Sequence, residues 1–224
     1  MEPQEPLERR LMSNWPYAIA LVPVAAAWLR GRLAGAAPDW TDLVAALLIL
    51  GLVILDQRQR RRLEGISITD RLTGVFNSRY LRVELDRQVH VAHRTQLPLS
   101  MIFIDVDDLK KVNDRHGHLA GDAVLRRVSA ALTTRIREHM DLCFRYGGDE
   151  FLVLCPHAGL AMAGAIAERI LGIRDALGDR GVTLSLGVIE LREGETPRDF
   201  LKRADGVMYS VKRRGKNAVG FDGA

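Results

Sequence analysis

Arg145-Tyr146-Gly147-Gly148-Asp149-Glu150-Phe151 is the stretch that decides the fold of this 224-residue chain, because a tight turn here leads directly into an apolar strand. The Gly147-Gly148 pair supplies the positive φ that a tight hairpin needs and, without Cβ atoms, lets a bulky ligand approach the backbone. Asp149 and Glu150 follow at the exposed turn, where a hard cation such as magnesium finds oxygen ligands. Taken alone, the pattern suits an ordinary hairpin with solvated acids as well as a phosphate and metal site.

The chain on both sides of this hairpin alternates between helix and strand from residue 70 onward. The spacing of apolar residues predicts helices near 80–92, 119–138, 163–170 and 197–213, and strands over 97–106, 143–146, 151–155, 182–189 and 217–221. Because the glycine turn makes one antiparallel pair in the middle of this order, we expect an α/β (α+β) fold with a sheet of mixed direction covered by helices.

The first 55 residues have a membrane-like composition. Residues 11–29 contain no charged side chain and have aromatic residues near both ends, and a second apolar run covers 43–55 and extends toward Trp40. The second run is short against the ~20 residues that a spanning helix usually needs. We expect two transmembrane helices at about 11–29 and 40–55, with a single span, a buried helical hairpin or a cleaved signal peptide as the alternatives.

These runs set the expected domains and location. Arginines precede the first run and follow the second, which places both ends in the cytoplasm and the chain in the inner (cytoplasmic) membrane. Residues 1–55 are the membrane segment, 56–69 a helical linker and 70–224 the cytoplasmic domain. Apolar residues of the linker lie roughly on one side, so it pairs with a second copy or stays a lone solvated helix.

The totals narrow the class of protein further. The formal net charge is +4, and the arginines gather after the second apolar run and near the end of the chain, which does not predict a nucleic-acid partner. Cys143 and Cys155 have neither metal-ligand nor redox-motif spacing. Free thiols in a reducing compartment are therefore expected.

Asp105 and Asp107 stand at the end of the predicted strand 97–106, and α/β folds place their ligands at strand ends. One of these alternating acids can face a site while the other braces a loop or caps the next helix. If this strand neighbours the glycine hairpin, Asp105 meets Asp149 and Glu150 across one edge of the sheet. Three converging acids repel one another, and a divalent metal resolves that repulsion.

Basic and amide side chains accompany these acids. Lys110 follows the acidic strand end, and Lys212 and Lys216 lie four residues apart at the end of the last predicted helix. They suit a phosphate ligand, although each lysine alone is more simply a solvated surface charge. Asn113 and Asp122 flank a glycine-containing loop, and such a pair can recognise guanine, because a carboxylate accepts from N1 and N2 and an amide donates to O6 or N7. Asp122 could otherwise merely favour the start of its helix.

Five blocks of sequence, taken in order, resemble the GGDEF domain, the diguanylate cyclase family. They run from Asp70 to Asn77, Asp105 to Asp122, Arg145 to Phe151, Ser185 to Val188, and Ala204 to Asn217. The resemblance covers about 66–221. It implies a nucleotidyl-cyclase-like fold with a mixed, largely antiparallel central sheet, and an enzyme that condenses two GTP molecules into cyclic di-GMP and releases two pyrophosphates.

The resemblance also implies a role for each candidate site residue. Two Mg²⁺ (or Mn²⁺) ions per GTP half-site would be held by Asp105, Asp149 and the Val106 carbonyl, with Glu150 at the metal and the attacking hydroxyl. Nucleotide contacts are implied for Gly147 and Gly148 at the backbone, for Lys110, Lys212 and Lys216 at the phosphates, and for Asn113 and Asp122 at guanine. Since each domain holds one GTP, the resemblance implies a homodimer as the catalytic unit.

Two positions depart from the family pattern. Lys216 stands where arginine is usual, which keeps the charge but loses the bidentate fork. The inhibitory product site is an Arg-x-x-Asp motif whose aspartate matches Asp141, but its arginine position is Glu138. Arg137 is one residue out of register, which on a helix would turn the side chain by about 100°. We therefore predict weak or absent product inhibition.

The sequence favours a membrane-anchored diguanylate cyclase. The alternative is a catalytically silent GTP-binding or scaffold module of the same fold. Intact Asp105, Lys110, Asp149 and Glu150 favour catalysis, because a purely structural domain does not require this arrangement of charge.

Overall fold

The computed structural model describes residues 40–173 and 182–223. The chain divides into two compact units, residues 1–67 and 68–224, and each is described by itself.

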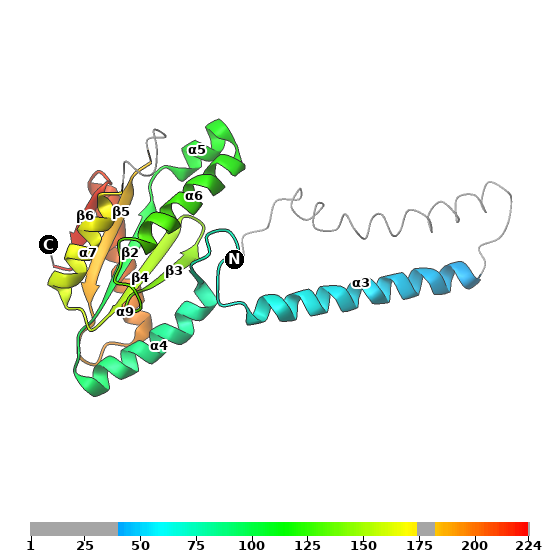
Figure 1. Cartoon of the computed structure of the whole chain (residues 1–224), viewed down its shortest axis with the longest axis horizontal. Coiled ribbons are helices and arrows are strands. Elements are labelled where there is room, and N and C mark those ends of the chain that lie inside the picture. Colours follow the sequence, from blue (N-terminus) through cyan, green and yellow to red (C-terminus); the bar gives the residue numbers. More distant parts are fainter. Residues whose placement is uncertain (1–39, 174–181, 224) are drawn as a thin grey trace. The chain divides into compact units, whose positions relative to one another are not determined.

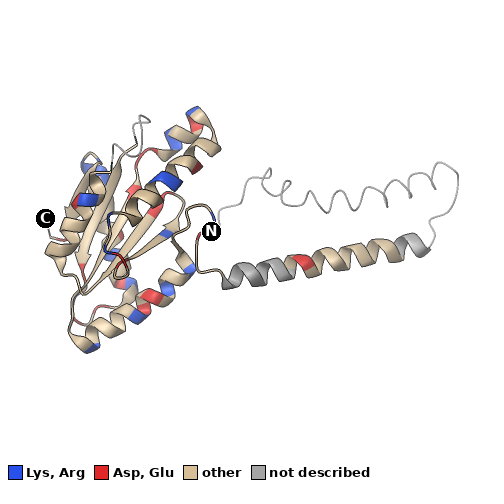
Figure 2. Cartoon of the chain, in the orientation of Figure 1, with Lys and Arg blue, Asp and Glu red and all other residues tan. Residues whose placement is uncertain are grey.

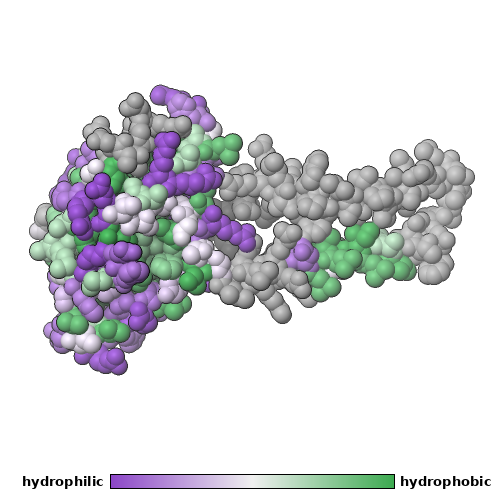
Figure 3. All heavy atoms as spheres, viewed as in Figure 1, coloured by the Kyte–Doolittle hydropathy of each residue, from purple (hydrophilic) through white to green (hydrophobic). Residues whose placement is uncertain are grey.

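The first unit contributes one long helix, α3 (Trp40–Ile66). Its apolar side chains are exposed along much of its length, and Figure 3 shows them as a hydrophobic surface; they include Leu47, Leu48, Leu50, Leu52 and Leu55. The predicted second apolar run and most of the predicted linker therefore belong to a single helix, while the predicted first span lies outside the described residues. Among the helices of the described part of the chain, none is both long enough and apolar enough to cross a membrane.

The second unit is built on one sheet of six strands, in the order β1-β3-β4-β2-β5-β6 (Figure 1). The strands are β1 (Phe76–Asn77), β2 (Leu99–Val106), β3 (Leu142–Gly147), β4 (Glu150–Pro156), β5 (Leu184–Glu190) and β6 (Ala218–Phe221). The three central pairs are antiparallel, and the outer pairs β1–β3 and β5–β6 are parallel. The predicted sheet of mixed direction is confirmed. The two-residue β1 was not predicted, because so short a strand carries no periodic signal.

Helices cover both faces of the sheet. One hydrophobic cluster joins α4 (Ser78–Thr95) and α9 (Pro197–Arg214) to one face. The other joins α5 (Leu109–His116), α6 (His118–Thr133) and α7 (Leu160–Leu171) to the opposite face. Met101 and Phe103 of β2 point into the first cluster, and Ile102 and Ile104 into the second. Because β2 is buried on both faces, its sequence is a nearly continuous apolar run.

Helix α6 ends at Thr133, five residues before the predicted end at Glu138. The hydroxyl groups of Thr133 and Thr134 donate to the carbonyls of Ala130 and Ala131, local bonds that compete with continued helix. The chain then turns, and Glu138 lies in that turn with its side chain 87% exposed. The predicted helical rotation of Arg137 relative to Glu138 is therefore wrong, because neither residue is on a helix.

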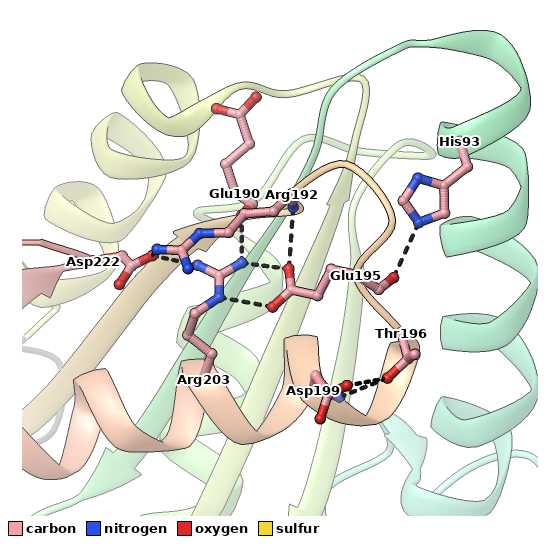
Figure 4. A network of polar contacts seen from close by, with 8 residues as sticks. All are labelled: His93, Glu190, Arg192, Glu195, Thr196, Asp199, Arg203 and Asp222. Carbon is pink, nitrogen blue, oxygen red and sulfur yellow. Dashed lines mark hydrogen bonds and ion pairs between the residues drawn. The ribbon is translucent and has the colours of Figure 1, made fainter.

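A polar clamp at the far end of the sheet fixes the start of α9 (Figure 4). Arg203 of α9 donates to both carboxylate oxygens of Glu195, to Asp222 after β6 and to the Glu190 carbonyl at the end of β5. His93 at the end of α4 contacts the Glu195 carbonyl at 3.0 Å. We call Arg203, Glu195 and Asp222 the Arg203 clamp. It joins α9 to the loop that precedes it and to the segment after β6.

Both cysteines lie inside the core. Cys143 on β3 and Cys155 on β4 are free thiols and are buried. Burial raises the pKa of Cys143 to about 12 and holds that of Cys155 well above its ordinary value. The predicted free thiols are thus unreactive core residues.

Candidate active site

The acidic end of β2 lies beside the turn between β3 and β4. Strands β2 and β4 pair so that Asp105 stands directly opposite Glu150, and the Val106 amide donates to the Asp149 carbonyl at 3.1 Å. Asp105 is 3% exposed, whereas Asp149 and Glu150 are partly exposed. Because β2 and β4 are neighbours in the sheet, the structure brings the three predicted acids together at one end of these two strands.

Burial and repulsion both act on these carboxyl groups. Burial is the largest cause of the raised pKa of Asp105; Lys212 opposes it, and the charge of Asp149 adds to it. Burial also comes first for Glu150, whose pKa is raised further by Asp105, Asp149 and Asp205. Like charges directly opposite each other destabilise a sheet. Carboxyl groups with raised pKa values that face one another are typical of functional sites, including sites that bind a cation.

Lys212, in the last turn of α9, is the basic residue closest to this acid group. Its Nζ atom lies 2.8 Å from Asp105 Oδ1. Although burial acts in the opposite direction, the contact with Asp105 and the charges of Asp149 and Asp107 raise the pKa of Lys212. The predicted phosphate-binding lysine is thus paired with a predicted metal ligand.

Asp107 has the bracing role expected for one of the two alternating acids. Its carboxylate accepts hydrogen bonds from the hydroxyl groups of Thr183 at 2.7 Å and Ser185 at 2.8 Å, and from the backbone N–H of Asn217 at 3.3 Å. Since Asp107 is only 1% exposed, these bonds occupy it within the protein. One carboxylate thereby joins the end of β2, the start of β5 and the segment after α9.

Asp108 and Lys216 form a second contact between the same two segments. Lys216 Nζ lies 2.8 Å from Asp108 Oδ1, and Lys111 Nζ lies 3.1 Å from the same oxygen. Asp108 and Lys216 both have positive φ, 58° and 63°. Asp108 precedes α5 but makes no side-chain capping bond to it. The nearby Lys110 is exposed in the first turn of α5.

The predicted guanine-binding pair lies on the two helices α5 and α6. Asn113 Oδ1 is buried and has no hydrogen-bond partner among the described residues. Gly121 of α6 lies against it, because a Cβ atom added there would be 1.9 Å from Asn113 Oδ1. Asp122 is the next residue of α6 and is partly exposed. A buried amide oxygen without a partner is unusual in proteins, and a ligand that donates a hydrogen bond here would satisfy it. Gly121 was not predicted as a site residue.

Arg145 and Asp70 also belong to the site, although we assigned them no role from the sequence. Arg145 Nη2 donates to the Gly148 carbonyl at 2.8 Å, and its Nη1 contacts Asp70 Oδ1 at 3.1 Å. Gly148 has a φ of +51°, and a Cβ at Gly147 would meet nothing within 4 Å. Arg145 therefore holds the open glycine turn against the start of the domain. The position of Arg145 directly before the glycine turn is the sequence feature that could have pointed to this role.

Asp141 and Arg137, at the predicted product site, bind each other. Arg137 contacts both Asp141 oxygens, the shortest distance being 2.6 Å, and its Nη2 also donates to the Pro156 carbonyl at 2.8 Å. The Asp141 side chain is fully buried and that of Arg137 is 20% exposed. Both side chains are thus committed to one internal ion pair.

The residues present fit a hard divalent cation by their chemistry. They offer carboxylate oxygens at Asp105, Asp149 and Glu150 and a carbonyl at Val106, and Asp105 Oδ1 already lies 2.8 Å from a cationic group, the Lys212 ammonium. Within the described ranges, however, no three His, Cys, Asp or Glu side chains are already arranged as a metal-binding group. The predicted metal ligands remain a prediction.

Acidic and basic residues are mixed along the helices of the second unit. In the view of Figure 2, acidic and basic residues alternate along α4 and lie side by side at the end of the domain that α5 and α6 form. Lys111 of α5, for example, lies 3.1 Å from Asp108.

Comparison with known proteins identifies relatives of this arrangement. A family model described as "Diguanylate cyclase, GGDEF domain" matches residues 67–218. The response regulator PleD of Caulobacter vibrioides is 42% identical over 163 residues, which cover 69% of this chain and 36% of PleD. The diguanylate cyclase DosC of Escherichia coli is 38% identical over 157 residues, 67% of this chain and 34% of DosC. The chain thus spans about a third of the length of these two relatives.

A solved structure has the same fold. The GGDEF domain of DgcB from Caulobacter crescentus, crystallised in complex with c-di-GMP, superposes with a TM-score of 0.65 at 29% identity. The match covers 70% of this chain and 94% of that domain.

Proposed function

The chain belongs to the GGDEF domain family of diguanylate cyclases, and on this premise we propose that it condenses two GTP molecules into cyclic di-GMP with release of two pyrophosphates. The observation that carries the proposal is the pairing of Asp105 with Glu150 across β2 and β4, with Lys212 2.8 Å from Asp105. Carboxylates that could bind a metal and a lysine that could bind a phosphate thus lie together at the end of β2.

The nucleotide is proposed to lie along the segment from the glycine turn to α6. Asn113 and Asp122 would bind guanine, and the unpartnered Asn113 Oδ1 supports a ligand at that position. The triphosphate would lie near Lys110, Lys212 and Lys216. Gly147 and Gly148 leave room beside the backbone, since a Cβ at either would meet nothing within 4 Å.

Two Mg²⁺ or Mn²⁺ ions per half-site are proposed, held by Asp105, Asp149, Glu150 and the Val106 carbonyl. Bound there, the metal would supply Lewis-acid stabilisation of the charge that develops on the phosphate. The side chains have their own tasks. Glu150 would orient the attacking ribose 3′-hydroxyl, and Lys212 and Lys216 would bind the departing pyrophosphate.

The catalytic unit is proposed to be a homodimer. Each domain offers one guanine-binding pair and one group of acids, so it can hold one GTP. The two bonds of a cyclic dinucleotide require two bound nucleotides that face each other. The proposed position is the inner membrane with the domain in the cytoplasm, which the apolar run 11–29 and the exposed leucines of α3 support.

Product inhibition is proposed to be weak or absent. Glu138, at the position of the motif arginine, would repel a phosphate, and its side chain is 87% exposed. Arg137 cannot replace that arginine without leaving its buried partner Asp141. Tight cyclic di-GMP binding to an Asp149→Ala protein, lost on Asp141→Ala, would contradict this.

The decisive experiment incubates the purified full chain with GTP and Mg²⁺ and measures cyclic di-GMP by liquid chromatography. Glu150→Gln and Asp149→Asn should lower the rate at least ~100-fold, because each removes a charge at the reacting groups. Glu193→Gln, an exposed acid beyond the other end of β5, is the matched control and should keep full activity. If the unmutated protein forms no product, the catalytically silent alternative holds.

A further inference from the structure

Lys212 makes a contact that phosphate binding alone does not explain. Its ammonium group lies 2.8 Å from Asp105 Oδ1, with the side chain of Lys212 31% exposed and that of Asp105 4% exposed. Asp105 is also the most buried of the three acids to which the proposed function assigns the metal.

A metal ion and the Lys212 ammonium would compete for the same oxygen. Mg²⁺ binds carboxylate oxygens at about 2.0–2.1 Å, and an ammonium at hydrogen-bonding distance from that oxygen occupies the neighbouring space. Two cations so close in a partly buried site repel each other strongly. A metal that binds Asp105 Oδ1 must therefore displace Lys212.

The displaced ammonium needs a new negative partner. Lys212 lies in the last turn of α9, and Lys216 just beyond the helix is already paired with Asp108. These two bases bracket the place proposed for the triphosphate. The phosphates of a nucleotide would supply the charge that Lys212 loses at Asp105, whereas a metal ion that arrives alone supplies none.

We propose, on the premise that this is the GTP site, that Lys212 is the resident counter-ion of Asp105 and makes metal binding depend on the nucleotide. Without nucleotide, Lys212 holds Asp105 and keeps the affinity for a divalent cation low. With nucleotide, Lys212 moves to the phosphates and frees Asp105. Because coupling between two ligands is reciprocal, the metal raises the affinity for nucleotide by the same factor.

The test measures Mn²⁺ binding to the full chain by electron paramagnetic resonance, first without nucleotide. Lys212→Met should bind Mn²⁺ at least ~10-fold more tightly than the unmutated protein, since the competing charge is gone. Lys212→Arg keeps the charge and should stay at the unmutated affinity. Lys202→Met removes an exposed lysine from the same helix and should also change nothing.

The same titration in the presence of a non-hydrolysable GTP analogue should reverse the order, with Lys212→Met now weaker than the unmutated protein. Lys212→Gln replaces the methionine variant if the absence of a cooperative thermal melt shows that the latter does not fold. The inference is overturned if the folded neutral variant, without nucleotide, binds Mn²⁺ no more tightly than the unmutated chain. If Mn²⁺ binding follows this pattern but the chain makes no cyclic di-GMP, only the proposed function is overturned. If the chain makes cyclic di-GMP but Mn²⁺ binding does not follow the pattern, only this inference is overturned.

Discussion

Gly121 shows how one missing methyl group can set the position of a binding residue. The amide of Asn113 lies where the Cβ of any other residue at 121 would be, at 1.9 Å from Asn113 Oδ1. Gly121 itself contacts no proposed ligand. It is a positioning residue, because it acts through Asn113.

Gly121→Ala should therefore weaken nucleotide binding more than it weakens the fold. We expect the dissociation constant for a GTP analogue with Mg²⁺ to rise about tenfold, equivalent to ~1.4 kcal/mol. The melting temperature should change little, because alanine favours a helix over glycine by about 1 kcal/mol and offsets part of the clash. Calorimetric titration is the measurement. Gly206→Ala, where a Cβ meets nothing within 4 Å, is the control; equal affinities of the two variants would remove Asn113 from the base site.

Arg145 and Asp70 connect the start of the domain to the glycine turn. Their side chains are 16% and 24% exposed, and Arg145 also binds the Gly148 carbonyl. Burial would raise the pKa of Asp70, but hydrogen bonds from Thr73 and the charge of Arg145 hold it below the ordinary value. The pair is therefore charged at neutral pH.

A double-mutant cycle can measure this connection. Arg145→Met and Asp70→Asn should each lower the free energy of unfolding in urea, by about 2 kcal/mol for Arg145, which leaves a partly buried acid unpaired. The double variant should lose less free energy of unfolding than the two single variants lose in sum, and the difference should be about 1 kcal/mol or more. Additive effects would show that the contact does not stabilise the fold.

At the scale of elements, periodicity predicted most of the second unit, and local bonds account for the errors. Strand β2 and helix α9 were found because their apolar spacing is long and regular. The end of α6 was misplaced because the hydroxyl bonds of Thr133 and Thr134 override a helical pattern that continues to Ile136. That Asp105 and Glu150 are neighbours could be predicted from the sequence on the assumption that β2 pairs with β4. The contacts of Gly121 and of the Arg203 clamp were not, because they depend on how helices pack.

The Arg203 clamp gives α9 a fixed start, and α9 carries Lys212 at its other end. Burial would raise the pKa of Glu195, but the hydrogen bonds from Arg203 and from the Arg192 backbone amide outweigh it and hold the pKa below its ordinary value. A carboxyl group with a lowered folded pKa stabilises the fold above its unfolded pKa, and that stability is lost as pH falls through the folded value.

Arg203→Met should lower the free energy of unfolding at pH 7 by about 3 kcal/mol, because it leaves the partly buried Glu195 carboxylate without its partner. The difference from the unmutated protein should shrink in acid, as the pH falls through the lowered folded pKa of Glu195 and the carboxylate takes up a proton. Thermal melts at pH 7 and pH 3.5 measure both values. Arg198→Met, an exposed residue of the same helix, is the control. A difference that stays constant with pH would mean that Arg203 acts through packing alone.

At the scale of the whole molecule, the proposed reaction needs two copies of the second unit. Residues 68–224 contain the complete sheet and both hydrophobic clusters, so we expect this piece to fold alone. Its dimers would have to form by collision, without help from residues 1–67.

Two measurements follow for this piece. At low concentration the rate of cyclic di-GMP formation should rise with the square of protein concentration, whereas the full chain should be closer to linear. An excess of Glu150→Gln subunits should suppress the unmutated ones, because mixed pairs lack one of the two Glu150 carboxylates. Linear kinetics of the piece and no suppression would exclude a catalytic dimer.

The burial of Cys143 and Cys155 has a practical consequence for such work. They are the only cysteines of the chain, and both are shielded from reagents that label thiols. A cysteine introduced at an exposed position, such as Leu119 at the start of α6, would be the one site open to a fluorophore or spin label. The separation between two such labels, one on each copy, could then be followed as nucleotide is added, without first removing a native thiol.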